Sequence, residues 1–360
     1  YNILALLALN MLVGKEEAGY FLYLLAAISL SAIGVRFGSD NYWLKAETGT
    51  LRKTKFEFRA MAVFSALVSL VVWWLVLDIG KSWLQLLCIF TIIMSQHYIM
   101  LTAKGLQVCG EHISSLFLQL VSGNFLSIPC FLIFDWDPLS AIVCSNILIC
   151  IYCIVLFRHK IRFTIYDSSI FERLHYLPMV YFGGINQNLM SIFSGFFGVI
   201  SQLPTLLLMQ RFFGLSGWPA SIYLQRELAK ISQITDVPTN AREIVEKFFS
   251  STFPVTTFLS VILVLPCFGY YILDSIPTLA LSLNIVFIQL GCLIAAVFSL
   301  APQILSIYSK GKSLALSLIL ATVVSFSAAL FSPTEISIAL GFLIFHAIFC
   351  MLNMHYVRRL

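Results

Sequence analysis

The sequence contains few charged residues. Only 11% of its 360 residues are Asp, Glu, Lys or Arg, whereas 59% are hydrophobic, and the mean hydropathy is +0.92. In a typical soluble domain about a quarter of the residues are charged. The scarcity of charge therefore excludes a water-soluble globular protein and predicts a protein with many membrane-spanning segments.

The sequence also lacks the common motifs of catalysis. It has no GxSxG, HExxH, P-loop or GxGxxG motif, which argues against a serine hydrolase, a metalloprotease, an ATPase and a dinucleotide-dependent enzyme. The nine cysteines lie almost entirely within apolar stretches, where they pack as small apolar side chains. We therefore expect no disulfide framework, no bound metal and no cofactor.

What the sequence does contain is a series of long apolar runs. An apolar start at residues 1–13 is too short to span a membrane and indicates an N-terminally truncated first helix. Further runs cover residues 18–36, 58–80, 82–103, 112–134, 138–157, 187–210, 213–232, 252–273, 277–300, 313–331 and 335–356. The expected fold is an all-α polytopic membrane protein of about 12 transmembrane helices. It would have two six-helix halves, residues 1–157 and 177–360, joined by a basic cytoplasmic linker at residues 158–176.

Lysine and arginine are distributed unevenly between the expected loops. If the N-terminus is cytoplasmic, 19 of the 22 lie on the cytoplasmic side, and only Lys15, Lys81 and Arg211 lie on the outer side. Such a bias sets the orientation of membrane proteins, and here it predicts that both termini are cytoplasmic. The net charge of +5 is then a signal of topology and of affinity for anionic membrane lipid, and we expect no binding to nucleic acid.

The two expected halves contain a weak internal similarity. A shift of 200 residues aligns Gly14 with Gly214, each at an expected turn. It also aligns Tyr23 with Tyr223, each in the helix after that turn. With an even number of crossings per half, a symmetry axis would run along the membrane normal, as in transporters with parallel repeats. Chance similarity among apolar helices is the alternative.

Here the sequence resembles a family. The segments Leu12-Val13-Gly14-Lys15-Glu16-Glu17-Ala18-Gly19-Tyr20 and Gly34-Val35-Arg36-Phe37-Gly38 resemble the start of the polysaccharide-repeat-unit (O-antigen type) flippases. These belong to the multidrug/oligosaccharidyl-lipid/polysaccharide exporter superfamily. The family repeats this turn at helices seven and eight, where residues 213–217 and 222–224 are similar to it.

The resemblance implies both an activity and a setting. The activity is transfer of undecaprenyl-diphosphate-linked oligosaccharide across the bacterial inner membrane, for O-antigen, capsule or exopolysaccharide assembly, by alternating access of the two halves. The protein would then be a transporter and not an enzyme. A polysaccharide polymerase and a chain-length regulator would be its partners.

A diphosphate-linked sugar calls for cations and hydrogen-bonding groups at membrane depth. The candidate residues for the diphosphate are Arg36, Arg211 and Arg226, because guanidinium groups match phosphate oxygens. Snorkelling of these side chains to the membrane surface is the alternative.

Amides and histidines complete the candidate set. The sugar-binding candidates are Asn186, Gln187, Asn188 and Gln202, unless these amides only join neighbouring helices. His97 is the candidate coupling residue, and His346 is a similar rarity in the last helix, because histidine titrates near neutral pH. A neutral histidine hydrogen-bonded across a helix interface is the alternative.

Two other functions remain open at this point. A cation-coupled multidrug exporter of the same superfamily would be favoured by acidic residues in the middle of the membrane. A polytopic glycosyltransferase or polymerase acting on the same lipid carrier would use Asp135 and Asp137, since a DxD pair can hold a metal and a donor phosphate. An interfacial turn is the alternative for that motif.

Overall fold

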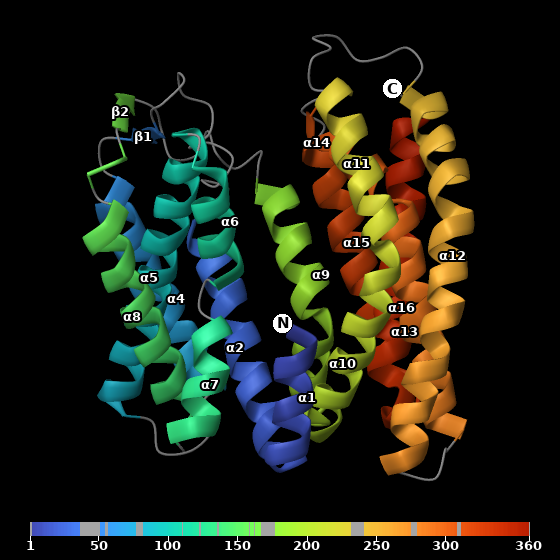
Figure 1. The fold of residues 1–360 in the computed structure, drawn as a ribbon, viewed down its shortest axis with the longest axis horizontal. Helices are drawn as coiled ribbons and strands as arrows, with labels where there is room; N and C mark the ends of the chain where they lie inside the picture. Colours follow the sequence, from blue (N-terminus) through green and yellow to red (C-terminus); the bar gives the residue numbers. More distant parts are fainter. Residues whose placement is uncertain are drawn as a thin grey trace. The chain divides into compact units, whose positions relative to one another are not determined.

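The structure is a computed structural model of the chain. It describes residues 2–36, 51–54, 57–76, 82–109, 111–121, 124–134, 137–157, 159–161, 163–166, 177–231, 241–274, 279–307 and 311–359. The chain forms two compact units, residues 8–192 and residues 1–7 with 193–360 (Figure 1). Each unit is mainly helical.

The unit of residues 8–192 contains the second part of α1, residues 8–12, and most of α9, residues 177–192. Its elements, with these two, are α1 (Asn2–Leu12), α2 (Lys15–Val35), β1 (Leu51–Thr54), α4 (Glu57–Val76), α5 (Trp83–Val108), α6 (His112–Val121), α7 (Asn124–Phe134), α8 (Pro138–Phe157), β2 (Phe163–Tyr166) and α9 (Leu177–Phe196). The other unit contains a 3₁₀ turn at Ile200–Gln202, α10 (Leu203–Gly214), a 3₁₀ turn at Leu215–Gly217, α11 (Trp218–Ile231), α12 (Ala241–Asp274), α13 (Leu279–Val297), α14 (Leu300–Ile307), α15 (Gly311–Leu330) and α16 (Thr334–Val357).

Two short strands were not predicted from the sequence. β1 and β2 pair in parallel, with Leu51 opposite Phe163 and Thr54 opposite Tyr166. β2 lies within the segment that was predicted to be a basic linker. The pairing therefore places the residues just before α4 beside the residues just after α8.

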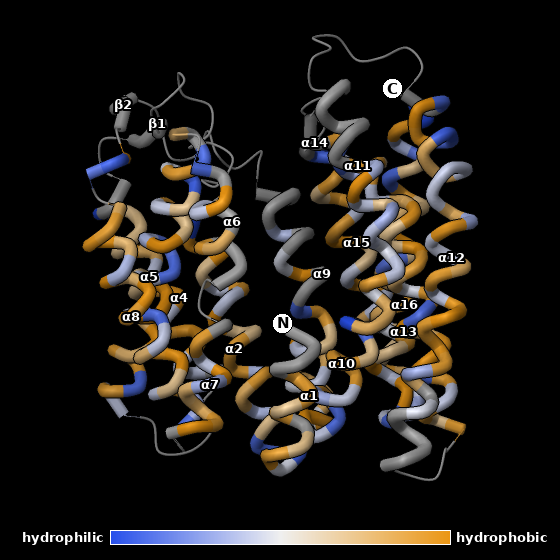
Figure 2. The backbone as a smooth tube through the Cα atoms, viewed as in Figure 1, coloured by the Kyte–Doolittle hydropathy of each residue, from blue (hydrophilic) through white to orange (hydrophobic). Residues whose placement is uncertain are grey.

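Seven helices in the described part of the chain are long and apolar enough to cross a membrane. They are α2, α5, α8, α12, α13, α15 and α16. Hydrophobic residues extend along most of the length of these helices (Figure 2). These helices are consistent with a polytopic membrane protein, because a span needs about 20 predominantly apolar residues.

One predicted span is wrong. Residues 187–210 do not form a single helix, because α9 begins at Leu177 and ends at Phe196, and Gly198 then takes a positive φ of 68°. The predicted turn at residues 213–217 is also wrong. Gly214 has φ −59° and ψ −26°, so the backbone is helical without interruption from Leu203 to Ile231, as Figure 1 shows for α10 and α11.

The glycines that were aligned in the internal similarity therefore differ in structure. Gly14 lies between α1 and α2 with an extended backbone, φ −59° and ψ 141°. Gly214 is helical, so the shift of 200 residues does not align two turns. The glycine that separates two helices in the second part of the chain is Gly198.

In the unit that contains residues 193–360, α13 and α16 are parallel neighbours. Asn284 near the start of α13 donates to the carbonyl of Glu335 near the start of α16, at 2.9 Å. Further along both helices, Cys350 donates to the carbonyl of Ile294 at 3.9 Å. α15 packs against α16 along much of its length. These three helices form the largest packed group of the unit.

Candidate functional site

Arg36 lies at the end of α2, where α9 crosses it. The side chain is 6% exposed, and the residue forms the C-terminal cap of α2. Two residues earlier, Gly34 leaves no room for a Cβ because the hydroxyl of Tyr181 on α9 occupies that space. Gly184 on α9 is packed in the same way against Ile33. Arg36 is therefore held at a close contact between two helices and is not a freely snorkelling side chain.

The amide candidates lie within α9, although they were predicted to begin a helix. Asn188 donates to the carbonyl of Gly184 in its own helix, at 2.8 Å. This bond uses the amide donor locally instead of across a helix interface. The side chains of Asn186 and Gln187 lie outside the described residues.

Arg211 does not lie at the outer end of a helix, as the sequence suggested, because the helical backbone continues past it. It lies in the last turn of α10 and interacts electrostatically with Cys292 on α13. The thiol of Cys292 also contacts the carbonyl of Gln210, at 3.7 Å. Among the residues that the structure describes, no carboxylate pairs with Arg211. A guanidinium without a carboxylate partner is a candidate anion-binding group.

The other two candidates of this part of the chain are less informative. Gln202 is partly buried in the 3₁₀ turn that leads into α10, and its backbone N–H donates to the carbonyl of Val199 at 3.1 Å. Arg226 belongs to α11, and its side chain is outside the described part of the structure.

His97 is buried in α5, with an exposed fraction of 1%. Ser95 and Thr102 lie within hydrogen-bonding reach of Cys150 and Cys153 and so define the side of α5 that faces α8. His97 is two positions from Ser95, about 200° around the helix, and so does not face α8. One unit contains Arg36, His97 and the three amides of α9, and the other unit contains Gln202, Arg211 and Arg226.

His346 is more deeply buried still, with an exposed fraction of 0%. Its ring makes edge-on contacts with Phe342 at 4.5 Å and with Phe345 at 5.3 Å between ring centroids. Neither ring nitrogen has a hydrogen-bond partner among the described residues. The sequence identified this histidine as a candidate because histidine is rare in the apolar helices. It could not show that the ring lacks polar partners.

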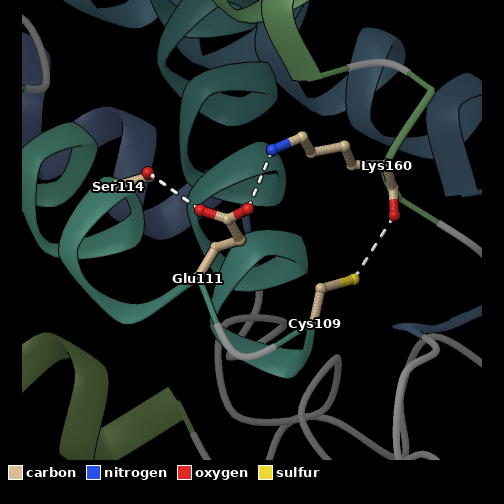
Figure 3. Close-up of polar contacts among 4 residues, drawn as sticks. All are labelled: Cys109, Glu111, Ser114 and Lys160. Atoms are coloured by element: carbon tan, nitrogen blue, oxygen red, sulfur yellow. Dashed lines mark hydrogen bonds and ion pairs between the residues drawn. The ribbon is translucent and has the colours of Figure 1, made fainter.

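Sequence reasoning missed a polar cluster at the turn between α5 and α6. The ammonium group of Lys160 pairs with a carboxylate oxygen of Glu111 at 2.8 Å, and the hydroxyl of Ser114 donates to the other oxygen at 3.3 Å (Figure 3). The thiol of Cys109 donates to the carbonyl of Lys160 at 3.3 Å. The hydrogen bond from Lys160 is the main reason why the pKa of Glu111 is lowered. The cluster ties this turn to the segment after α8.

Asp137 caps α8. One of its carboxylate oxygens accepts from the backbone N–H groups of Leu139 and Ser140, both at 3.1 Å. This is the ordinary role of an aspartate before a helix and requires no metal. Asp135, the other acidic residue of the DxD motif, lies outside the described residues.

Comparisons with protein-family models, with curated proteins and with solved structures found no match for this chain.

Proposed function

We propose that this protein is a flippase that moves undecaprenyl-diphosphate-linked oligosaccharide repeat units across the bacterial inner membrane. The observation that carries this proposal is that both units repeat one order of helix packing. In residues 8–192, α2 packs on α4, α4 on α5, α5 on α8, and α7 on α8. In the second unit, α11 packs on α12, α12 on α13, α13 on α16, and α15 on α16. This order supports two related sets of helices.

The two sets also correspond in sequence order. α1, Gly14 and α2 correspond to α9, Gly198 and the helical segment of α10 and α11. α5 and α8 are parallel neighbours, because Ser95 lies near Cys150 and Thr102 lies near Cys153 further along both helices. α13 and α16 are parallel neighbours as well. If α6 with α7, α10 with α11, and α14 with α15 each count as one segment, the correspondence gives six helical segments in each set. It supports 12 spans in two halves with both termini on one side. Transporters built from two repeated halves work by alternating access.

The chemistry of the substrate favours Arg36 and Arg211, the two candidate arginines whose side chains the structure describes. A diphosphate carries charge that hydrocarbon cannot accommodate, and guanidinium groups donate to phosphate oxygens with matching geometry. Arg36 is buried at a helix contact, and Arg211 has no carboxylate partner in the described part of the chain. A cation left without a carboxylate at membrane depth is costly, which supports an anionic ligand for it.

The alternatives have less support. No Asp or Glu is buried among the described residues, whereas a cation-coupled multidrug exporter of the same superfamily would be favoured by buried acids. The glycosyltransferase or polymerase alternative requires Asp137, which already serves as a helix cap. The flippase therefore remains the proposal, with lipid-linked oligosaccharide as substrate and without a cofactor.

The test is deletion of the gene in the organism that carries it, followed by complementation. We expect deletion to accumulate lipid-linked repeat units in the cytoplasmic leaflet and to reduce surface polysaccharide. Wild type and Arg211→Lys should restore both, at least in part, whereas Arg211→Gln should not. Arg359→Gln, which alters an exposed arginine after α16, is the matched control and should complement fully.

Each readout separates the proposal from its alternatives. Surface polysaccharide that is unchanged on deletion would contradict the flippase. Unchanged polysaccharide with increased sensitivity to toxic cations would favour the multidrug exporter. Loss of the assembled polymer without accumulation in the cytoplasmic leaflet would favour the polymerase.

A further inference from the structure

The contact between α13 and α16 encloses a histidine in apolar surroundings. Phe342 packs so closely on Gly291 that a Cβ at this glycine would lie 2.6 Å from two ring carbons. One turn further along α16 comes His346, and one more turn brings Cys350, which reaches the carbonyl of Ile294. Because Phe342 and Cys350 both contact α13, the residue between them on the same face lies against α13 as well.

The ring of His346 is sealed in this interface without a polar partner. Its exposed fraction is 0%, and neither ring nitrogen is hydrogen-bonded to any residue that the structure describes. A neutral imidazole has one donor and one acceptor to satisfy, and an imidazolium has two donors and a charge. The closed interface offers no hydrogen-bond acceptor to the neutral ring or to the protonated ring. It therefore disfavours the protonated ring more strongly, because that form also carries a charge.

Among the described residues, no charged neighbour compensates for a proton on this ring. α16 packs against α13, α14 and α15, and its Gly341 lies against the apolar ring of Phe193 on α9. α13 contributes only the thiol of Cys292, α14 has no titratable residue, and the only one on α15 is Lys312, exposed at its start. On α16 itself, Glu335 lies near the start, His355 and Tyr356 lie near the end, and Cys350 is a buried thiol.

We propose that His346 is a proton-binding site whose protonation opens the contact between α13 and α16. The proton adds to the lone pair of the unprotonated ring nitrogen. The resulting imidazolium is stable only where water reaches it, so the proton favours a conformation in which the two helices have separated. His97 is almost as deeply buried, but it interacts with another group, so His346 is the better candidate.

This site would couple the transporter to a proton gradient, and that role rests on the function proposed above. Proton binding to His346 does not depend on the substrate. It can therefore be tested on the purified protein in detergent or nanodiscs, with no ligand except the proton.

The experiment is hydrogen–deuterium exchange of α13 and α16, corrected for the intrinsic pH dependence of exchange. A hydrated histidine titrates near pH 6.5, so the open population should increase about tenfold between pH 7.5 and pH 5.5. We expect this increase in the wild type and in His355→Gln, which changes the exposed histidine of the same helix. We expect no increase in His346→Gln or His346→Leu.

Two outcomes would contradict the proposed proton-binding site. One is exchange in the wild type that does not depend on pH, and the other is a pH response that persists in either His346 variant. Leu fills the apolar space without a polar atom, so it tests the site even if Gln disturbs folding. The two proposals can also fail separately. If both His346 variants lose the pH response but deletion of the gene leaves surface polysaccharide intact, the proton site is supported and the flippase is contradicted.

Discussion

Gly291 of α13 lies directly against the ring of Phe342 on α16. A Cβ built on this glycine would be 2.6 Å from two carbons of that ring and 3.5 Å from the Cα of Leu343. Real Cβ atoms do not approach other atoms so closely, and the backbone of α16 limits how far the ring can retreat. The glycine is therefore required by the close approach of two helices and not by its own backbone conformation.

We accordingly expect Gly291→Ala to destabilise the protein. Overpacking of a tightly packed contact costs about 1–3 kcal/mol. Thermal unfolding in detergent measures this loss. Gly269→Ala is the matched control, because Gly269 lies in α12 with no atom within 4 Å of its Cβ position. That change should stabilise the helix slightly, by about 0.5–1 kcal/mol. Equal effects of the two substitutions would contradict the close contact.

The spans that the sequence predicted well are those with continuous apolar runs. The predicted residues 138–157 and 335–356 correspond closely to α8 (Pro138–Phe157) and α16 (Thr334–Val357). Hydropathy identifies such helices because the membrane requires an apolar surface over their whole length.

The same signal fails where polar residues lie within a helix or where glycine leaves the backbone helical. Asn186, Gln187 and Asn188 lower the hydropathy of α9, so its start at Leu177 was missed. Gly214 and Gly217 were read as a turn, but both lie in helical backbone, whereas Gly198 forms the real break. Hydropathy cannot distinguish these glycines, because it measures the preference of a residue for lipid and carries no information on the backbone angle φ.

The candidate site was predictable only in part. Residue type pointed to Arg36 and Arg211, since cations are rare in apolar helices. Their surroundings were not predictable, because Tyr181 and Cys292 come from segments distant in the sequence. The pair of Glu111 and Lys160 was missed for the same reason, as its members are 49 positions apart.

The break at Gly198 gives a second prediction. Its φ of 68° lies in the left-handed region, where a residue with a Cβ is strained by about 1–2 kcal/mol. Gly198→Ala should therefore lower the unfolding temperature, and Gly198→Asn should lower it less, because asparagine tolerates this region better. Gly214→Ala, at a helical glycine with no atom near its Cβ position, should not lower it. A loss of stability in Gly214→Ala and none in Gly198→Ala would restore the turn at residues 213–217.

The ion pair of Glu111 and Lys160 gives a third prediction. The pKa of Glu111 is lowered from its ordinary value of 4.5, mainly by the hydrogen bond from Lys160. A lowered carboxyl pKa in the folded state contributes stability above pH 4.5 that is lost as the pH falls through the lowered value. The stabilisation is small because both side chains are exposed to solvent.

Unfolding temperatures measured between pH 7 and pH 3 test this sign. Wild type should exceed Glu111→Gln at pH 7, and the difference should decrease below pH 4.5. In a Lys160→Met background the same substitution should have little effect at any pH, because the partner of the carboxylate is absent. A difference that increases as the pH falls would show that the sign is wrong.

Asp137 gives the last prediction, which separates a helix cap from a catalytic carboxylate. Its carboxylate accepts from the backbone N–H groups of Leu139 and Ser140 at the start of α8. Loss of such a cap costs about 1 kcal/mol, whereas asparagine caps a helix about as well as aspartate. Asp137→Ala should therefore destabilise the protein, and Asp137→Asn should preserve its stability.

Surface polysaccharide then decides between the two roles. Asparagine keeps the cap but removes the negative charge that a metal-bound sugar donor requires. Cells that carry Asp137→Asn, alone or together with Asp135→Asn, should assemble polymer like the wild type if Asp137 is only a cap. If instead polymer is lost while the purified variant unfolds at the wild-type temperature, the carboxylate is chemically required. The glycosyltransferase or polymerase would then replace the flippase, because a transporter has no use for a metal-binding carboxylate pair at this position.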